Sequence, residues 1–175
     1  MLYFTADPHF YHEKIIQHIG RPFRDAEEMN RVLIENWNRR VRAEDEIYIL
    51  GDLTMKGPMP ANAVLSQLRG RKHLIRGNHD GFVSRAAFDV SQFVSVRDYA
   101  EITYQNTLLV LCHYPFLEWN ESREGSISLH GHQHNPPEYN EENLRRGIRR
   151  FDVGVDANDM KPVSAEDIIA FFSLL

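Results

Sequence analysis

The chain has 175 residues, of which 42% are hydrophobic, and a formal net charge of −5. This size and composition favour one domain spanning residues 1–175, and the acidic balance excludes a global basic field that would attract nucleic acid. The single cysteine, Cys112, excludes an intrachain disulfide and is expected to be a buried, small hydrophobic residue. The sequence shows no signal peptide and no membrane-length apolar run, so we expect a cytoplasmic protein.

The first half of the chain predicts alternating strands and helices. Asp25 precedes an acidic first turn, and apolar residues then recur at four-residue spacing, which indicates an amphipathic helix over 26–42. Gly70 ends a second predicted helix at Pro60–Arg69. Three short apolar runs are expected to be buried strands: Leu2–Ala6, Glu46–Leu50 and His73–Arg76.

The second half of the chain predicts mostly strands. Tyr99–Tyr104 and Thr107–Cys112 flank two turn residues, as in a β-hairpin. Ser164 is expected to cap a last helix rich in Ile and Phe. The polar segment Asn135–Arg150 is interpreted as an exposed loop whose arginines are solvated. Two further short strands are predicted at Ile127–Leu129 and Phe151–Val155.

Four short motifs contain residues that bind metal ions, and most of them begin where an apolar run stops. They are Asp7-Pro8-His9, Gly51-Asp52, Gly77-Asn78-His79-Asp80 and Gly131-His132-Gln133-His134, with His113 between the last two. Alternate residues of a strand point to the same side, so Asp-x-His and His-x-His pairs can face one site. In sheets with helical crossovers, sites gather at the carboxyl ends of strands.

The ligand types favour a hydrolytic metal site. An Asp-x-His pair often occurs by chance and Gly-Asp after a strand is usually a turn, whereas Gly-His-x-His is moderately specific. Coincidence of all the motifs, in order and at strand ends, amounts to a few per cent. Carboxylate, amide oxygen and imidazole suit manganese, iron or zinc, and the lack of a cysteine ligand argues against a purely structural zinc site. Two such ions can generate hydroxide at neutral pH and hold a phosphate for in-line attack.

Taken together, the motifs resemble those of the calcineurin-like metallophosphoesterase family. That family's pattern runs Asp-x-His, Gly-Asp, Gly-Asn-His-Asp or -Glu, a lone His and Gly-His-x-His, and every block is present between Asp7 and His134. The resemblance covers essentially the whole chain. It implies an α+β fold, a four-layer αββα sandwich in which two β-sheets pack face to face with helices outside.

The resemblance also implies a role for each motif residue. Asp52 would bridge two metal ions, and a metal-bridging hydroxide would attack phosphorus. His79 would act as a general acid or polarise the phosphate, and Asp80 would orient His79 by accepting a hydrogen bond. Two divalent ions, with Mn²⁺ as first choice and Fe, Zn, Ni or Co as alternatives, would be held by two ligand sets: Asp7, His9 and His134, and then Asn78, His113 and His132.

Departures from well-known members narrow the predicted substrate. Gly51-Asp52-Leu53-Thr54-Met55-Lys56-Gly57 lacks the phosphate-binding arginine of Ser/Thr protein phosphatases, and the short segment from His113 to Gly131 leaves no room for a large cap domain. Asp7–His12 and Gly20–Phe23 resemble a small bacterial and phage branch of the family. We therefore expect a phosphodiester, nucleotide or other small phosphate ester as substrate.

Other polar residues are candidates for lesser roles. His12, Arg21 and Arg76 are candidates for contacts with the substrate phosphate. His130 is expected in the core or behind the metal ligands. The remaining residues are expected to be structural or at the surface: His18 and His73, with Asp156 and Asp159 in turns after the last strand.

Two competing functions stay open at this point. A metal-dependent nuclease would use the same ligands, but the acidic charge and the lack of a basic stripe make nucleic acid an unfavoured partner. A non-catalytic scaffold with the same fold belongs to another class, and the complete ligand set and His79 argue against it. A homo-oligomer, in which a neighbouring subunit completes the uncapped site, is also compatible with the sequence.

Overall fold

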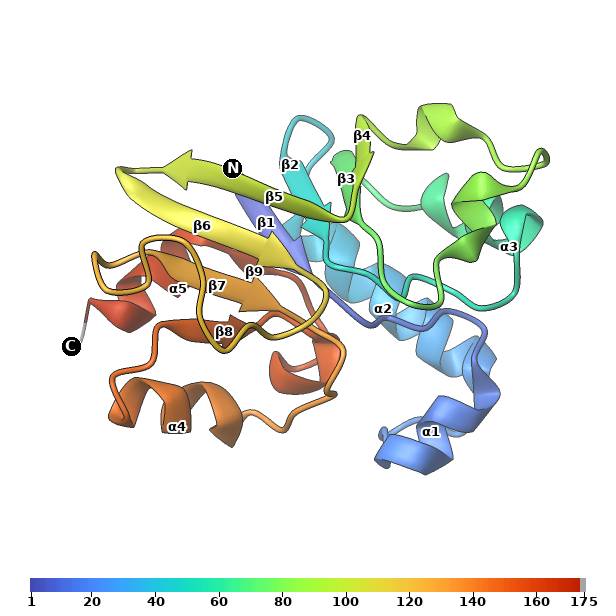
Figure 1. Ribbon diagram of the computed structural model, residues 1–175. Coiled ribbons are helices and arrows are strands. Elements are labelled where there is room, and N and C mark those ends of the chain that lie inside the picture. The colour runs from blue at the N-terminus through green and yellow to red at the C-terminus, as the bar shows by residue number, and fades with distance from the viewer. Residues whose placement is uncertain (174–175) are drawn as a thin grey trace.

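The computed structural model describes residues 1–173 (Figure 1). A mostly parallel sheet combines three strands from the first half of the chain with two later ones. Its strand order is β4-β3-β2-β1-β9, and only β9 runs antiparallel to its neighbour. The three strands predicted in this region are confirmed, with ends that shift by one or two residues. The bounds are β1 (Leu2–Thr5), β2 (Glu46–Ile49), β3 (Arg71–Ile75), β4 (Ser95–Arg97) and β9 (Val163–Ser164).

A second sheet follows, with the strand order β5-β6-β7-β8. The predicted hairpin is confirmed, because β5 and β6 pair antiparallel and Gln105 and Asn106 take the left-handed conformation of a tight turn, with φ of 46° and 63°. β6, β7 and β8 are parallel. The bounds are β5 (Tyr99–Tyr104), β6 (Thr107–Cys112), β7 (Ile127–His130) and β8 (Arg150–Asp152).

Helices flank the two mixed sheets, as the sequence led us to expect. The Asp25 side chain accepts a hydrogen bond from the Glu28 amide at 2.8 Å, and Ser164 caps the last helix in the same way. The helices are α1 (Glu13–Ile19), α2 (Ala26–Arg40), α3 (Pro58–Leu65), α4 (Glu138–Arg145) and α5 (Ala165–Phe172), with 3-10 turns η1 (Gly81–Ser84), η2 (Val90–Gln92) and η3 (Val155–Ala157). No helix in residues 1–173 is both long and apolar enough to cross a bilayer.

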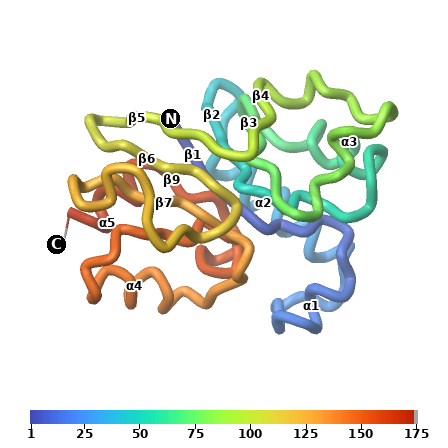
Figure 2. Tube along the Cα trace, viewed as in Figure 1, coloured from blue at the N-terminus to red at the C-terminus, as the bar shows by residue number. Residues whose placement is uncertain are grey.

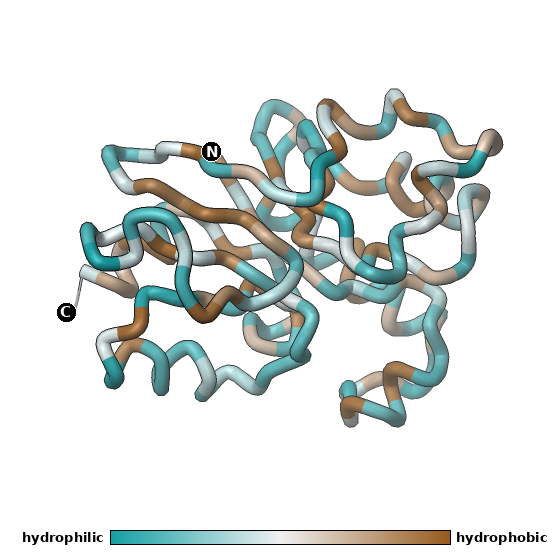
Figure 3. Tube along the Cα trace, in the orientation of Figure 1, coloured by the Kyte–Doolittle hydropathy of each residue, from teal (hydrophilic) through white to brown (hydrophobic). Residues whose placement is uncertain are grey.

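The exposed loop predicted from Asn135 to Arg150 is wrong, because this segment contains α4. The helix escaped detection because its buried face is polar. Asn140 and Asn143 donate hydrogen bonds to the backbone of β8, at 3.0 and 3.1 Å, so no apolar periodicity marks this helix. Figure 3 shows α4 as almost entirely hydrophilic, in contrast to the hydrophobic β6.

Two of the four arginines of that segment differ from expectation, whereas Arg145 and Arg146 are exposed as predicted. The Arg149 guanidinium lies 5.1 Å from the ring centroid of Phe172, and Arg150 donates a hydrogen bond to the Phe116 carbonyl at 2.8 Å. Both are half-buried. They therefore pack against α5 and the β6–β7 connection instead of forming a solvated basic cluster.

The alternation of side chains along the strands builds two hydrophobic cores. In β1, Leu2 and Phe4 point into the core between the two sheets, whereas Tyr3 points to the core beneath the helices. Cys112 is buried, as predicted. Figure 2 traces the chain through both sheets, and the arrowheads of β1, β6 and β7 meet near the middle of the molecule in Figure 1. The loops that leave these strand ends carry the candidate site.

Candidate metal centre

The first group of candidate ligands combines residues that follow strands of both sheets. Asp7 and His9 follow β1, and His134 follows β7, and their ligand atoms lie within 4.8 Å of one another. His134 contacts Asp156 through Nδ1, at 2.7 Å, which leaves Nε2 for the site. We call Asp7, His9 and His134 the first cluster.

A second group lies beside the first. Asp52, His113 and His132 also place ligand atoms within 4.8 Å of one another. His113 bonds through Nδ1 to the Leu50 carbonyl at 2.8 Å, so its Nε2 faces the site, 3.1 Å from Oδ1 of Asn78. We call this the second cluster, with Asn78 at its edge.

The Asp52 carboxylate lies between the two clusters. Its Oδ2 atom is 3.6 Å from Nε2 of His9 and 3.6 Å from Nε2 of His113. The Asp52 side chain is almost fully buried, and its Oδ1 accepts a hydrogen bond from the His79 amide at 2.9 Å. One carboxylate therefore faces ligands of both clusters, which is the geometry that a bridging ligand needs.

The unpaired atoms of the site fit divalent cations. Among the described residues, Oδ1 of Asp7 and both ring nitrogens of His9 are buried without a hydrogen-bond partner. In the second cluster, Nε2 of His113 and Nδ1 of His132 lie 3.2 Å apart, close enough for one cation to contact both. Buried polar atoms normally have partners, and a cation at the first cluster would bind Oδ1 of Asp7 and one ring nitrogen of His9.

The pKa shifts of Asp7 and His9 also favour a bound cation. Burial, and then the neighbouring carboxylates of Asp152 and Asp52, raise the pKa of Asp7 well above its ordinary value. Burial, and then the nearby His134, lower the pKa of His9 to about 2, so this imidazole is neutral at physiological pH. Neutral imidazoles beside crowded carboxylates are the form in which these groups bind metal ions.

The backbone of the site is held in unusual conformations. Several of the ligand residues have a positive φ, a region that non-glycine residues rarely adopt. A Cβ atom on Gly77 would stand 2.3 Å from Oδ1 of Asp52, and one on Gly131 would stand 2.3 Å from Oδ2 of Asp7. Glycine is required there because the loops approach the ligands so closely. The ligands with positive φ are Asp7, His9, Asp52, His132 and His134.

Asp80 holds the loops of the site together. Its buried carboxylate accepts hydrogen bonds from the amides of Asp52, Leu53 and Gly77, at 2.8, 2.9 and 2.8 Å. The expected hydrogen bond to the His79 ring is therefore replaced by bonds to the backbone that carries Asp52 and Asn78. The half-buried His79 ring places Nε2 3.9 Å from Oδ2 of Asp52.

The expectation that Arg21 contacts phosphate is wrong, because its side chain is fully buried behind the first cluster. It forms a two-pronged ion pair with Asp156, with both distances 2.8 Å, and donates to the carbonyls of Asp7 and Pro8 at 2.7 and 3.0 Å. Asp156, expected in a simple turn, accepts from both Arg21 and His134. The position of Asp156 shortly after a strand, β8, is the signal in the sequence that could have identified it.

Other candidates lie around the centre. A cavity of about 370 Å³ is lined by His12 and His18, together with His9, Asp52 and His79. His12 thus stays a candidate for substrate contact, and His18, expected to be structural or at the surface, borders the same space. His130 is buried behind the ligands, where its Nε2 lies 3.2 Å from the Tyr139 hydroxyl.

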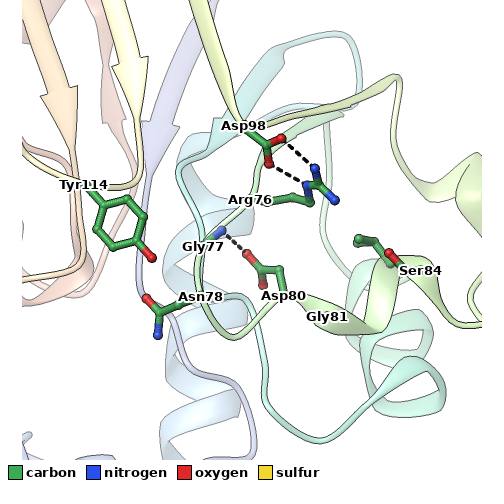
Figure 4. Close-up of a pocket in the computed structure, with 9 residues that line it drawn as sticks. Arg76, Gly77, Asn78, Asp80, Gly81, Ser84, Asp98 and Tyr114 are labelled. Carbon is green, nitrogen blue, oxygen red and sulfur yellow. Dashed lines mark hydrogen bonds and ion pairs between the residues drawn. The ribbon is translucent and has the colours of Figure 1, made fainter.

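Arg76 borders a second cavity of about 470 Å³, which meets the first at Asn78 (Figure 4). His73 lies away from both cavities, between Ser95 and Glu46. Asp159 pairs with Lys161 at the surface. Another residue that sequence reasoning missed is Asp152, a buried carboxylate that bonds to the amide of Gly154 and raises the pKa of Asp7.

A family model described as calcineurin-like phosphoesterase matches residues 2–158. The chain belongs to the calcineurin-like phosphoesterase family. The resemblance seen in the sequence motifs is thus confirmed, and with it the expected fold of two sheets flanked by helices. Membership in this family implies metal-dependent hydrolysis of phosphoester bonds.

Relatives of this calcineurin-like phosphoesterase occur in archaea, phages and bacteria. An uncharacterized protein of Methanocaldococcus jannaschii is 35% identical over 172 residues, covering 96% of this chain and 89% of the relative. The gene 66 protein of Mycobacterium phage L5 is 30% identical, covering 89% and 86%. A crystal structure of a protein of unknown function from Aquifex aeolicus is 29% identical, covers 97% and 98%, and superimposes with a TM-score of 0.75.

Proposed function

We propose that the protein hydrolyses a phosphodiester, nucleotide or other small phosphate ester with two divalent cations, Mn²⁺ being our first choice. The observation that carries this proposal is the position of Asp52 between two ligand clusters, 3.6 Å from an imidazole nitrogen of each. Divalent cations, when bound there, would lower the pKa of water and offset the charge of the phosphate. The clusters would hold one cation each, and Asp52 would contact both.

His79 supplies the acid of the proposed reaction. Its ring is only half-buried and borders the same cavity as the two clusters. Its amide is tied to Oδ1 of Asp52, so the ring is held at the edge of the centre. His79 would donate a proton to the oxygen of the leaving group as the phosphorus–oxygen bond breaks, or would polarise the phosphate.

The nature of the site favours small substrates over protein or nucleic acid chains. The net charge of −5 provides no general attraction for a polyanion. Positive charge would be concentrated at the two clusters, where a single phosphate group can reach it. We therefore propose a small phosphate ester as partner, and a nuclease activity receives no support from the surface.

Hydrolysis of bis-p-nitrophenyl phosphate by metal-stripped protein, before and after addition of Mn²⁺, tests this function. We expect the metal to restore release of p-nitrophenolate, with about two ions bound per chain by elemental analysis. Asp52→Asn should lower activity by at least a hundredfold, since a bridging carboxylate is lost. Full activity in metal-replete Asp52→Asn protein would contradict the proposal.

A matched control separates the role of Asp52 from a general effect of lost charge. Asp159→Asn removes one carboxylate from an exposed pair with Lys161, and it should keep full activity and metal content. If the unmodified protein binds no divalent metal and cleaves neither a diester nor a monoester, the scaffold interpretation replaces the enzyme.

A further inference from the structure

A second cavity opens beside the metal centre, on the side of Asn78 away from His9. Its volume is about 470 Å³, within the range of small-molecule sites. Figure 4 shows Tyr114 on the side opposite Ser84, with Arg76 and Asp98 above the floor formed by Gly77 and Asp80. Since Asn78 borders both cavities, a group bound at the clusters can extend into either one.

The Tyr114 ring offers a flat surface at the entrance to this cavity. Tyr114 follows directly after His113, and its side chain is 45% exposed, which is unusual for a large aromatic residue. Its ring stands edge-on to the imidazoles of His113 and His132, with centroid distances of 5.0 and 4.7 Å. These contacts hold the ring in place, and its exposed part offers a planar group an aromatic surface on which to stack.

The opposite wall is polar but electrically balanced. Arg76 donates from Nε and Nη2 to the two carboxylate oxygens of Asp98, at 2.7 and 2.6 Å. This pair cancels the charge of the guanidinium and fixes its plane, while no hydrogen bond within residues 1–173 uses its Nη1. With Ser84 close by, the wall offers hydrogen bonds and no net positive charge, so it suits a neutral polar group better than a second phosphate.

We propose that this cavity binds the arm of a phosphodiester that stays on the phosphate after hydrolysis, and that this arm is a nucleoside. The inference rests on the proposed function and specifies its substrate. A nucleoside combines a planar base, which can stack on Tyr114, with hydroxyl and carbonyl groups for Arg76 and Ser84. The leaving arm lies in the other cavity, where His79 stands.

The cavity in which each arm lies determines which product that arm becomes. Water adds to phosphorus as the bond to the leaving oxygen breaks, and His79 gives that oxygen its proton. The retained arm leaves as a nucleoside monophosphate, and the other as an alcohol. A phosphate monoester has no second arm, so it leaves the Tyr114 cavity unused and gains nothing from it.

Two synthetic diesters isolate the retained arm. Thymidine 5′-(p-nitrophenyl phosphate) and methyl p-nitrophenyl phosphate release the same leaving group and differ only in the arm assigned to this cavity. With Mn²⁺-loaded wild-type protein we expect kcat/KM to be roughly tenfold or more higher for the thymidine ester, as base stacking on an aromatic side chain allows. Equal values for the two esters would overturn the inference.

Filling the cavity tests its location. A Cβ atom on Gly81 would meet no atom within 4 Å, so Gly81→Trp adds bulk to the cavity wall without a backbone clash. We expect the ratio of kcat/KM for the two esters to fall close to one in this variant. Ala86→Trp adds the same side chain to an exposed position outside the cavity and should keep the wild-type ratio. Should Gly81→Trp fail to fold, Ser84→Trp places the same bulk at the other end of η1.

Substitution of the stacking residue completes the test. Tyr114→Ala should lower the ratio about tenfold and Tyr114→Phe should preserve it, because the ring and not the hydroxyl does the stacking. A Gly81→Trp or Tyr114→Ala variant that lowers both values of kcat/KM equally would overturn the assignment while leaving the proposed function intact. If metal-replete wild-type protein cleaves neither ester, and no monoester, the proposed function falls and the inference with it.

Discussion

Arg21 and Asp156 form a buried, two-pronged ion pair in which Nε and Nη2 of the arginine each lie 2.8 Å from a carboxylate oxygen. The pair joins parts of the chain that are 135 residues apart. Because Arg21 also holds the Asp7 and Pro8 carbonyls while Asp156 holds His134, the pair fixes both sides of the first cluster. It is therefore a positioning device for metal ligands that touches no substrate.

Replacement of Arg21 should weaken metal binding before it affects any chemical step. Arg21→Met leaves Asp156 buried without its partner, and we expect a loss of about 3–5 kcal/mol in the free energy of unfolding. Arg21→Lys keeps the charge but not the fork, so it should fold and bind Mn²⁺ about 10–100-fold more weakly. Calorimetric titration of the stripped protein measures this affinity. Unchanged affinity in Arg21→Lys protein would show that the pair does not position the cluster.

His79 should matter most for poor leaving groups. In His79→Asn protein we expect kcat to fall roughly 10²–10⁴-fold for an ester with an alkyl leaving group, because no acid protonates the departing oxygen. The loss should be much smaller for p-nitrophenolate, which leaves without a proton. The hydrogen bond to Asp52 comes from the backbone amide of His79, so the substitution should leave this bond intact. The activities are compared at equal metal content. Equal losses for both leaving groups would favour phosphate polarisation over proton donation.

Gly77 should tolerate no side chain. A Cβ atom there would lie 2.3 Å from Oδ1 of Asp52 and 2.7 Å from its amide nitrogen, so Gly77→Ala must displace the carboxylate that faces both clusters. We expect Gly77→Ala protein to lose more than half a bound metal ion per chain relative to wild type. Elemental analysis after desalting measures this loss. Gly81→Ala, four residues later and in open space, should keep its metal.

Acid should reveal the pairing of Asp156 in metal-free protein. Burial by itself raises the pKa of this carboxyl, but hydrogen bonds from His134 and Arg21 outweigh burial and hold the pKa at about 2. The stability that Asp156 contributes is thus fully present above its ordinary pKa of 3.8 and is lost as the pH falls through about 2. Between about pH 5 and 2, wild-type protein should lose on the order of 2 kcal/mol more stability than Asp156→Asn. Urea unfolding in EDTA measures both curves, and parallel curves would contradict the pairing.

Most of the candidate ligands could be predicted from the sequence because they occupy short motifs at strand ends. Asp7 and His9, or His132 and His134, are close in the chain, and their chemistry is legible without any knowledge of packing. The same holds for α2, whose apolar spacing and Asp25 cap are local signals. Local motifs at strand ends thus supported the family resemblance, which in turn implied the fold and the ligand set.

The missed features depend on distant partners. No residue near Arg21 in the sequence indicates that Asp156 pairs with it. From sequence alone, a buried structural arginine therefore looks the same as a phosphate-binding arginine at the surface. The motif predicts a hydrogen bond from His79 to its neighbour Asp80, whereas Asp80 accepts its hydrogen bonds from the amides of Asp52, Leu53 and Gly77. A helix such as α4, which buries asparagines against strand backbone, also has no apolar pattern to read.

Each cluster combines residues that follow strands of both sheets, so cutting the chain into two fragments would divide both clusters. A cut in the turn at Gln105–Asn106 would put Asp7, His9 and Asp52 on one fragment and all ligands from His113 onward on the other. Neither fragment could hold a complete cluster. Cation binding would therefore require that the two fragments associate, so metal uptake can be used to measure fragment complementation.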